Sequence, residues 1–396
     1  MKKLLLFSIF SFIMFPALRA SMQLNDTTVY LLTCAPGNET YSLWGHSALR
    51  VVMPGSDYDK VYNWGVFDFA TPHFAWKFAK GRLNYMLGVY GYEAFIKDYF
   101  VESRSVISQI VNLTPVEKLR LMILLDENMK PENRYYRYDF LYDNCSSRIR
   151  DILEKLLGNK LIYPPDELEQ SPTFRDRIGQ YTRNSPWTKM GIDLLVGTPA
   201  DKKTTFRDRM FLPDDLQKNL TRAIINRDRK MFPLLYPAET ILDMPATGTK
   251  PPLYGTPIFV FTVIFIFLVF LSARFKDRAF MTYMDIALFL VFSVIAILMI
   301  FFSFFTDHIE TRMNLNILWF NPFILTGLIS LITGKRISAW FKVIFWLALV
   351  FVPLVIIMPA MINSSFIPVI FILLLRSSAR AGFQWNPLSV APANKE

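Results

Sequence analysis

The sequence predicts an α+β domain followed by an all-α bundle of five membrane-spanning helices. Short β-branched and aromatic segments mix with helical patterns before about position 255, whereas long apolar runs dominate the remainder. The composition agrees with a chain that is partly embedded in a membrane, because 52% of the 396 residues are hydrophobic and only 19% are charged, a low share for a soluble protein. A chain of this kind has ample material for a packed core, which excludes a disordered protein and a small disulfide scaffold.

The N-terminus has the pattern of a secretory signal peptide. Two lysines precede an apolar run over 4–15, and Ala20 is a small residue at a suitable cleavage position. We therefore predict a signal peptide over 1–20 and export of the domain that follows it. An uncleaved signal anchor is the alternative, because the residues just before Ala20 make an imperfect cleavage site.

Five apolar runs predict a transmembrane domain over 256–378. They cover 256–275, 284–305, 317–333, 343–362 and 366–375, and the last is short for a span. If the preceding domain is exported, every loop rich in Lys and Arg falls on the cytoplasmic side, as the positive-inside rule requires. The sequence thus predicts a multi-pass inner-membrane protein with its α+β domain in the periplasm and a cytoplasmic tail over 379–396.

The formal net charge of +10 does not indicate nucleic-acid binding. Basic residues lie in the short loops between apolar runs or alternate with acidic residues, so topology and solvated surfaces explain them. A metal site is not expected either, because two cysteines and three histidines, His46, His73 and His308, offer no ligand spacing. We expect no nucleic acid, no metal and no cofactor.

Residues 21–160 are predicted to form the exported α+β domain. Segments rich in β-branched or aromatic residues and bounded by turn residues are expected strands: 29–33, 48–53 and 60–67. One helix is expected after Thr114, which begins a capping-box pattern. Another is expected after Asn144, where apolar residues recur at helical spacing up to Gly158.

The remaining segments leave alternatives open. Residues 161–236 are predicted as a helical extension of short helices and loops, and 237–255 as a proline-rich linker. The aromatic stretch 67–100 either packs in the core or lies against the bilayer. The polar loop 306–320, which contains His308, is either functional or an ordinary interfacial loop.

Cys145 is the candidate nucleophile of the exported domain. The first turn of a helix presents unpaired N–H groups and a partial positive charge, which stabilise a thiolate. A thiolate also needs a base, and a ring on a rigid strand is easiest to hold in place, which favours His46 over the loop residue His73. The competing interpretation is a structural disulfide between Cys34 and Cys145 in an oxidising periplasm, and composition alone leaves both open.

Several short motifs resemble those of the Bacteroides-type lipoprotein N-acyltransferases, the Lnb family. They are Leu31-Leu-Thr-Cys-Ala-Pro-Gly, Tyr41-Ser-Leu-Trp-Gly-His-Ser-Ala-Leu-Arg-Val, Asn63-Trp-Gly-Val-Phe-Asp-Phe and Tyr142-Asp-Asn-Cys-Ser, followed by Pro186-Trp, Phe211-Leu-Pro and the five apolar runs. The resemblance covers nearly the whole mature chain. It implies a circularly permuted papain-like (NlpC-related) periplasmic domain in which the histidine, His46, precedes the cysteine, Cys145.

The resemblance also implies an activity. A phospholipid donates an acyl chain, through a thioester on Cys145, to the α-amino group of the diacylglyceryl-cysteine that begins an apolipoprotein. Asn63 and Asp68 are the candidates to orient the His46 ring, and Asn144 or backbone N–H groups are candidates to stabilise the oxyanion. Capping of the helix is the alternative role of Asn144.

Two other functions remain open at this point. The same pair of side chains in a permuted papain-like fold suits a membrane-anchored hydrolase of peptidoglycan peptides or lipid esters. A disulfide between Cys34 and Cys145 would instead suit a non-enzymatic membrane sensor or assembly factor. Without that bond, Cys34, His73 and His308 are possible accessory residues of the site.

Overall fold

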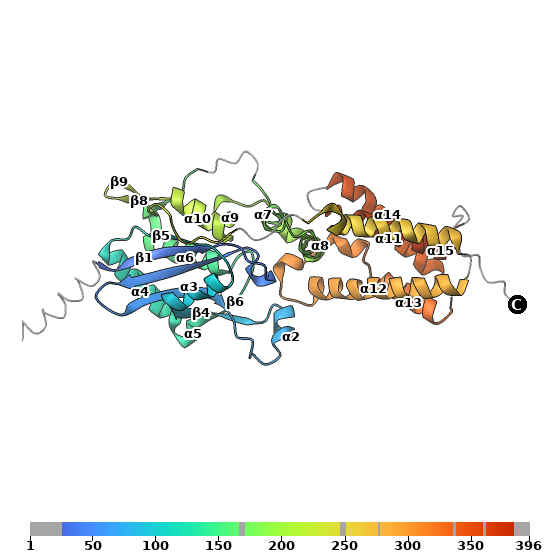
Figure 1. Ribbon diagram of the computed structural model, residues 1–396, viewed down its shortest axis with the longest axis horizontal. Coiled ribbons are helices and arrows are strands. Elements are labelled where there is room, and N and C mark those ends of the chain that lie inside the picture. The colour runs from blue at the N-terminus through green and yellow to red at the C-terminus, as the bar shows by residue number, and fades with distance from the viewer. Residues whose placement is uncertain are drawn as a thin grey trace, which may run out of the picture. The chain divides into compact units, whose positions relative to one another are not determined.

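The computed structural model describes residues 26–165, 171–245, 251–275, 278–335, 338–358 and 362–383. The chain forms two compact units, one made of 1–171 with 204–247 and the other of 172–203 with 248–396. Figure 1 shows the elements of each unit. The signal peptide predicted over 1–20 and residues 384–396 of the predicted tail lie outside the described residues.

A seven-stranded antiparallel sheet is the centre of the first unit, with the strand order β10-β5-β1-β2-β3-β4-β6 (Figure 1). Its strands are β1 (Thr28–Cys34), β2 (His46–Met53), β3 (Tyr58–Val66), β4 (Asn84–Gly91), β5 (Val106–Ile110), β6 (Tyr135–Arg137) and β10 (Glu239–Leu242). The three strands expected from the sequence coincide with β1, β2 and β3. Alternating side chains of these strands enter two different clusters, as the two-residue period of a strand requires.

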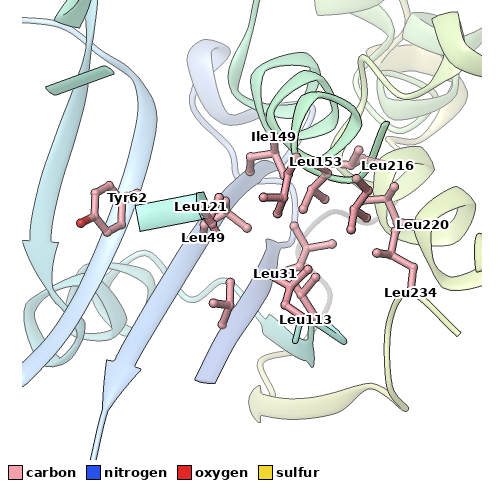
Figure 2. Packing of buried hydrophobic residues seen from close by; sticks show 14 of the residues in the cluster. Leu31, Leu49, Tyr62, Leu113, Leu121, Ile149, Leu153, Leu216, Leu220 and Leu234 are labelled. Carbon is pink, nitrogen blue, oxygen red and sulfur yellow. The ribbon is translucent and has the colours of Figure 1, made fainter. Parts of the chain in front are cut away.

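Helices cover both faces of this sheet. The helices of this unit are α2 (Phe74–Ala79), α3 (Tyr92–Val101), α4 (Pro115–Met129), α5 (Pro131–Arg134), α6 (Cys145–Leu157), α9 (Phe206–Arg209) and α10 (Pro213–Arg222), of which α2 and α5 bury no residue. The larger core joins Leu31 and Leu49 of the sheet to Ile149 and Leu153 of α6 and to Leu216 of α10 (Figure 2). Helix α3 packs on the other face through a smaller cluster.

The chain after α6 departs from the predicted extension and linker. Residues expected to be helix and loop form a small sheet of β7 (Leu161–Ile162), β8 (Ile224–Arg227) and β9 (Lys230–Pro233). β10 falls within the predicted linker 237–255 and pairs with β5. Strands of two to four residues are too short to show a periodic pattern, so pairing with a distant strand, which the sequence does not display, decides their structure.

The second unit contains α7 (Phe174–Tyr181), α8 (Pro186–Leu195), α11 (Pro257–Arg274), α12 (Arg278–Phe304), α13 (Phe323–Ile332), α14 (Ser338–Ile357) and α15 (Phe366–Ala381). Within the part of the chain that the structure describes, four segments are long and apolar enough to cross a membrane: 257–274, 279–304, 315–332 and 338–355. Four of the five expected spans are therefore long and apolar enough to cross a membrane. The fifth run is the helix α15, which has only 16 residues and packs against α11 and α14.

Helix α15 carries two arginines into the apolar interior of its unit. Arg376 donates from Nε and Nη2 to the two carboxylate oxygens of Asp285 on α12, at 2.7 and 3.0 Å, and Arg380 donates from Nε to the same carboxylate at 2.5 Å. Arg376 also donates to Ser272 Oγ of α11 at 2.6 Å. Arg376 and Asp285 are fully buried. This cluster joins three helices, and it satisfies charges that would otherwise be costly in an apolar bundle.

The polar loop 306–320 has a structural role in the second unit. Asn314 donates from Nδ2 to the carbonyls of Leu194 and Leu195, at 2.7 and 2.9 Å, and Asn316 donates to the carbonyl of Asp193 at 3.1 Å. These carbonyls belong to the last turn of α8, which has no intrahelical donor for them. The asparagines therefore fix α8 to the loop between the second and third apolar segments.

Candidate active site

His46 and Asn63 form the base and orienting pair of the candidate site. His46 is the first residue of β2 and Asn63 lies on β3, the neighbouring strand. Nε2 of His46 lies 2.5 Å from Oδ1 of Asn63. Because an amide oxygen only accepts, Nε2 is the donor, and Nδ1 is the ring nitrogen left for the thiol of Cys145.

Cys145 is the first residue of α6, and the start of this helix packs against the start of β2. The Oγ atoms of Ser47, next to His46, and Ser146, next to Cys145, lie 3.2 Å apart. The Cys145 side chain is 9% exposed, and its Sγ lies 3.8 Å from Ser146 Oγ. The start of the strand thus holds the base against the start of the helix that holds the nucleophile.

The two groups shift each other's ionisation. Burial opposes ionisation of the Cys145 thiol, but the charge and hydrogen bond of His46, helped by the Ser47 N–H and the Ser146 hydroxyl, outweigh it and lower the pKa of Cys145. Burial likewise opposes protonation of His46, but the thiolate of Cys145 and hydrogen bonds to Cys145 and Asn63 raise the pKa of the ring. Both shifts favour a thiolate–imidazolium pair, the reactive form of a cysteine nucleophile.

A pH profile of thiol alkylation is expected to report this pair. Because the pKa of Cys145 is lowered, the rate of its modification by iodoacetamide should reach half of its plateau below pH 9.0, the ordinary pKa of a thiol. In a His46→Ala variant burial remains while the opposing charge is lost, so the midpoint should move above that value. Equal midpoints in the two proteins would show that His46 does not act on the thiol.

Gly45 directly precedes His46, and only glycine can occupy this position without strain. Its φ is +79°, in the left-handed region, and a Cβ there would lie 2.7 Å from the carbonyl oxygen of Cys34. The backbone of β1 therefore approaches too closely for any side chain just before the base.

Gly45→Ala is expected to destabilise the protein by more than about 1–2 kcal/mol, the usual cost of the left-handed conformation, because a clash with backbone adds to it. Gly55→Ala is the matched control, since Gly55 has the same φ of +79° but no atom within 4 Å of its Cβ position. Denaturant unfolding measures both, and only Gly45→Ala should also slow alkylation of Cys145. An equal loss of stability in the two variants would contradict the close approach.

The cysteines are both free and differ in character. Cys34 ends β1 opposite His46 in the strand register, is fully buried, and forms no disulfide with Cys145. Burial raises the pKa of Cys34 to about 12, so it stays a thiol at neutral pH. The structural disulfide considered from composition is therefore not present, and Cys34 is a core residue beside the site.

Asn144 is the N-cap of α6. Its Oδ1 accepts from the N–H groups of Ser146 and Ser147, at 2.9 and 3.0 Å, while its Nδ2 donates to the carbonyls of Phe140 and Phe211, at 2.7 and 3.0 Å. Of the two roles considered from the sequence, these contacts assign the cap, because the side-chain amide has no hydrogen left for an oxyanion. A cap of this kind stabilises a helix by about 1 kcal/mol.

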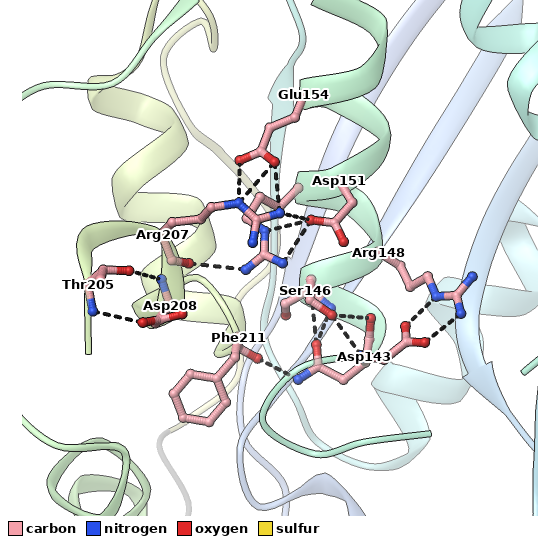
Figure 3. A network of polar contacts seen from close by, with 12 residues as sticks. Asp143, Ser146, Arg148, Asp151, Glu154, Thr205, Arg207, Asp208 and Phe211 are labelled. Atoms are coloured by element: carbon pink, nitrogen blue, oxygen red, sulfur yellow. Dashed lines mark hydrogen bonds and ion pairs between the residues drawn. The ribbon is translucent and has the colours of Figure 1, made fainter. Parts of the chain in front are cut away.

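Ion pairs hold the start of α6 in place (Figure 3). Arg148 makes a two-pronged pair with Asp143, just before the cap, and Arg207 on α9 donates to Asp151 and Glu154 at 2.5 and 2.9 Å. The second set is about half exposed and worth little in stability. Its effect is to tie the segment that contains Phe211 to α6.

The other predicted site residues lie elsewhere. Asp68 accepts from the N–H of Ala70 at 2.8 Å in an exposed turn, so Asn63 and not Asp68 contacts His46. His73 is an exposed N-cap residue of α2 with a φ of +57°. His308 belongs to the second unit, where its Nδ1 lies 3.4 Å from the carboxylate of Glu310. Over the described ranges, no group of three or more His, Cys, Asp or Glu is placed to hold a metal ion.

Tyr136 is a candidate site residue that sequence reasoning missed. It lies on β6, belongs to the same buried cluster as Cys145, and is 8% exposed. Its ring lies under the guanidinium of Arg148, one helical turn after Cys145, at 4.0 Å. Its hydroxyl is buried beside the backbone N–H of Gly65 and has no acceptor for its own hydrogen among the described residues. The sequence shows only an aromatic strand here, and nothing in it distinguishes Tyr136 from the tyrosines beside it.

Fold and site together define a class of protein: an α/β domain with a cysteine–histidine–asparagine site, joined to a helical region suited to a membrane. Comparison with known families identifies the class more closely. Residues 14–171 match the Lnb N-terminal periplasmic domain, and residues 250–384 match the Lnb transmembrane domain. The chain belongs to the Lnb family, as its motifs predicted, and this membership indicates a membrane-associated role in lipoprotein processing. No curated protein and no solved structure matches the chain.

Proposed function

We propose that this protein is a lipoprotein N-acyltransferase with Cys145 as its nucleophile and a permuted papain-like catalytic domain. The observation that carries the proposal is the chain of contacts from Asn63 to His46 to Cys145 at the start of a helix, in a domain of the Lnb family. A phospholipid is the acyl donor, and the diacylglyceryl-cysteine of an apolipoprotein is the acceptor. The catalytic domain faces the periplasm and the C-terminus the cytoplasm.

The first half-reaction loads the enzyme. His46 accepts the proton of Cys145 at Nδ1, and the thiolate attacks the carbonyl carbon of a phospholipid acyl ester. The tetrahedral intermediate collapses with cleavage of the bond between that carbon and the glycerol oxygen. His46 returns its proton to this oxygen, so a lysophospholipid leaves and an acyl thioester remains on Cys145.

The second half-reaction unloads the enzyme. The neutral α-amino group of the acceptor attacks the thioester carbonyl, His46 accepts a proton from the nitrogen, and the carbon–sulfur bond breaks. An amide forms, and Cys145 and His46 return to the thiolate–imidazolium pair. Because both substrates react through one thiol, the kinetics should be ping-pong.

Both half-reactions pass through an oxyanion that needs hydrogen-bond donors. The backbone N–H of Cys145 is at the first position of α6, where helix geometry provides no intrahelical acceptor. The Tyr136 hydroxyl is the second donor that we assign, because a buried hydroxyl whose hydrogen has no acceptor is unfavourable unless an acceptor arrives during the reaction. Asn63 keeps the Nε2 hydrogen of His46 in place throughout.

Tyr136→Phe is expected to lower kcat by about 10–100-fold, somewhat less than removal of a backbone donor in a dedicated oxyanion hole. Its stability should stay equal or rise, because the variant removes an unsatisfied buried group. Tyr62→Phe is the control, since the Tyr62 hydroxyl is 2.6 Å from that of Tyr58 in the same core. That variant should lose stability and keep its activity. A Tyr136→Phe enzyme with full activity would remove the hydroxyl from the mechanism.

Product analysis tests the proposed function. Full-length protein is incubated with phospholipid and a diacylglyceryl-cysteine lipopeptide, with Cys145→Ala as the matched blank, and the products are identified by mass spectrometry. An N-acylated lipopeptide that is absent from the blank is expected. Release of free fatty acid alone, or cleavage of muropeptides, would instead identify a hydrolase with the same nucleophile. No reaction beyond the blank would favour a sensor or assembly factor.

A further inference from the structure

The segment between β3 and β4 carries a cluster of aromatic side chains, here called the aromatic tip: the exposed Phe69, Trp76 and Phe78 and the partly buried Phe67 and Phe74. Phe69 is 71% exposed, Trp76 56% and Phe78 50%. Helix α2, which lies in this segment, has no buried residue at all. Exposed aromatic area of this extent is unfavourable in water, and contiguous patches of it mark interaction surfaces.

The rings of the aromatic tip form one continuous surface. The centroids of Phe67 and Phe69 are 5.0 Å apart, those of Phe69 and Phe74 also 5.0 Å, and those of Phe74 and Phe78 6.0 Å. These are the distances of packed aromatic pairs. The tip is therefore a preformed apolar surface, and a partner does not have to assemble it.

This aromatic surface continues inward toward the candidate site. Phe67 contacts Tyr85 of β4 at 5.3 Å, and Tyr85 stacks on Tyr138 at 4.5 Å. The Tyr138 ring in turn lies beside Gly65, where a Cβ would be 3.8 Å from it. Gly65 is on β3, two residues after Asn63. A track of aromatic rings thus connects the exposed tip with the strand that orients His46.

Basic side chains accompany the tip. Lys77 and Lys80 are on or next to α2, Arg82 follows them, and Lys80 Nζ lies 4.9 Å from the centre of the Trp76 ring. The one acidic residue of the segment 67–82 is Asp68. Exposed aromatic rings next to lysines are typical of segments that lie in a membrane interface, where the rings reach the acyl boundary and the cations meet phosphate. The membrane-suited helices of the same chain keep this domain beside such a surface.

We propose that the aromatic tip docks into the boundary between headgroups and acyl chains of a phospholipid bilayer, and that the aromatic track leads a donor acyl chain toward the site. The track rests on the proposed function, because a phospholipid donor is what gives it a purpose. The docking of the tip does not, since it requires only lipid. The two parts are therefore tested by separate measurements.

Site-specific photocrosslinking tests the docking. Full-length protein that carries benzoylphenylalanine at position 69 or 76 is reconstituted in vesicles of phosphatidylethanolamine and phosphatidylglycerol and irradiated. Phospholipid adducts are expected at both positions. The control position is Phe100 at the end of α3, which is 61% exposed but outside the tip. Absence of adducts at 69 and 76, equal labelling at 100, or adducts to a protein instead of lipid would overturn the docking.

Kinetics tests the track. In the double variant Phe67→Ser with Tyr85→Ser, which removes two rings of the track, thioester formation from vesicle phospholipid should fall by about 10-fold or more, because the apolar path from the tip to β3 is lost. Acylation of Cys145 by a water-soluble short-chain p-nitrophenyl ester should stay unchanged. The matched control is Phe100→Ser with Val101→Ser. Equal losses with both donors would show that the fold, and not lipid access, was damaged.

Two further outcomes distinguish failure of the proposed function from failure of the docking or of the track. If wild-type protein forms no thioester with phospholipid while position 76 still crosslinks to lipid, the proposed function fails and the docking stands. If thioester forms normally in the variant Phe67→Ser with Tyr85→Ser, the acyl transfer stands and the track is refuted.

Discussion

Cys145→Ala is expected to abolish thioester formation and acyl transfer, a loss of at least about 10⁴-fold in kcat/KM, because the proposed thioester forms on the sulfur that this variant removes. His46→Ala should lose about 10²–10⁴-fold, since the thiol then lacks both its base and the charge that lowers its pKa. Both are measured by intact-protein mass spectrometry of the acyl-enzyme and by appearance of the N-acylated lipopeptide.

The control for these variants is the second cysteine. Cys34 is a buried thiol with a pKa near 12, so Cys34→Ala should form the thioester at close to the wild-type rate and lose only some stability. Loss of acylation in Cys34→Ala with retention in Cys145→Ala would reverse the assignment of the nucleophile.

Asp285→Asn is expected to cost the second unit about 3–5 kcal/mol in free energy of unfolding, because it leaves two buried guanidinium groups without a counter-charge. Thermal unfolding of the detergent-solubilised protein measures the loss. Ser272→Ala removes a single neutral acceptor from Arg376 and should cost only about 1 kcal/mol.

A compensated variant makes this second prediction sharper. Asp285→Leu combined with Arg376→Met and Arg380→Met removes all charges of the cluster and should recover most of the stability that Asp285→Asn loses. An Asp285→Asn protein that unfolds at the wild-type temperature would show that water reaches the arginines. Failure of the compensated variant alone would mean that the ion cluster also sets the packing of α15.

Local signals explain which elements the sequence predicts. The segments of β1 to β3 are rich in β-branched or aromatic residues and bounded by turn residues, and the helix α4 begins with the capping box of Thr114 and Glu117, which the structure contains. The sequence does not indicate where α15 ends, because the residue that pairs with its last turns is distant in the chain. Arg376 looks like the end of an apolar run, but the helix continues to Ala381 because Asp285, distant in sequence, pairs with the arginines.

The candidate site likewise has residues that the sequence predicts and residues that it does not. A cysteine at a helix start and a histidine at a strand start are visible in the sequence, and the structure brings these two residues together. The choice between Asn63 and Asp68 depends on the pairing of β2 with β3, which puts only Asn63 at His46. The vacant hydroxyl of Tyr136 is a property of packing alone, so no pattern in the sequence reports it.

The first unit is built from two segments that are separated in the sequence, and this has a consequence for biogenesis. Its sheet is completed by β10, and the cap of α6 is completed by the carbonyl of Phe211, after the chain has passed through residues 172–203 of the other unit. During export the nascent chain therefore carries Cys145 well before it carries the parts that fix it. Cys145 therefore reaches its final surroundings only after residues 204–247 have followed, shortly before the first apolar helix, α11, in the chain.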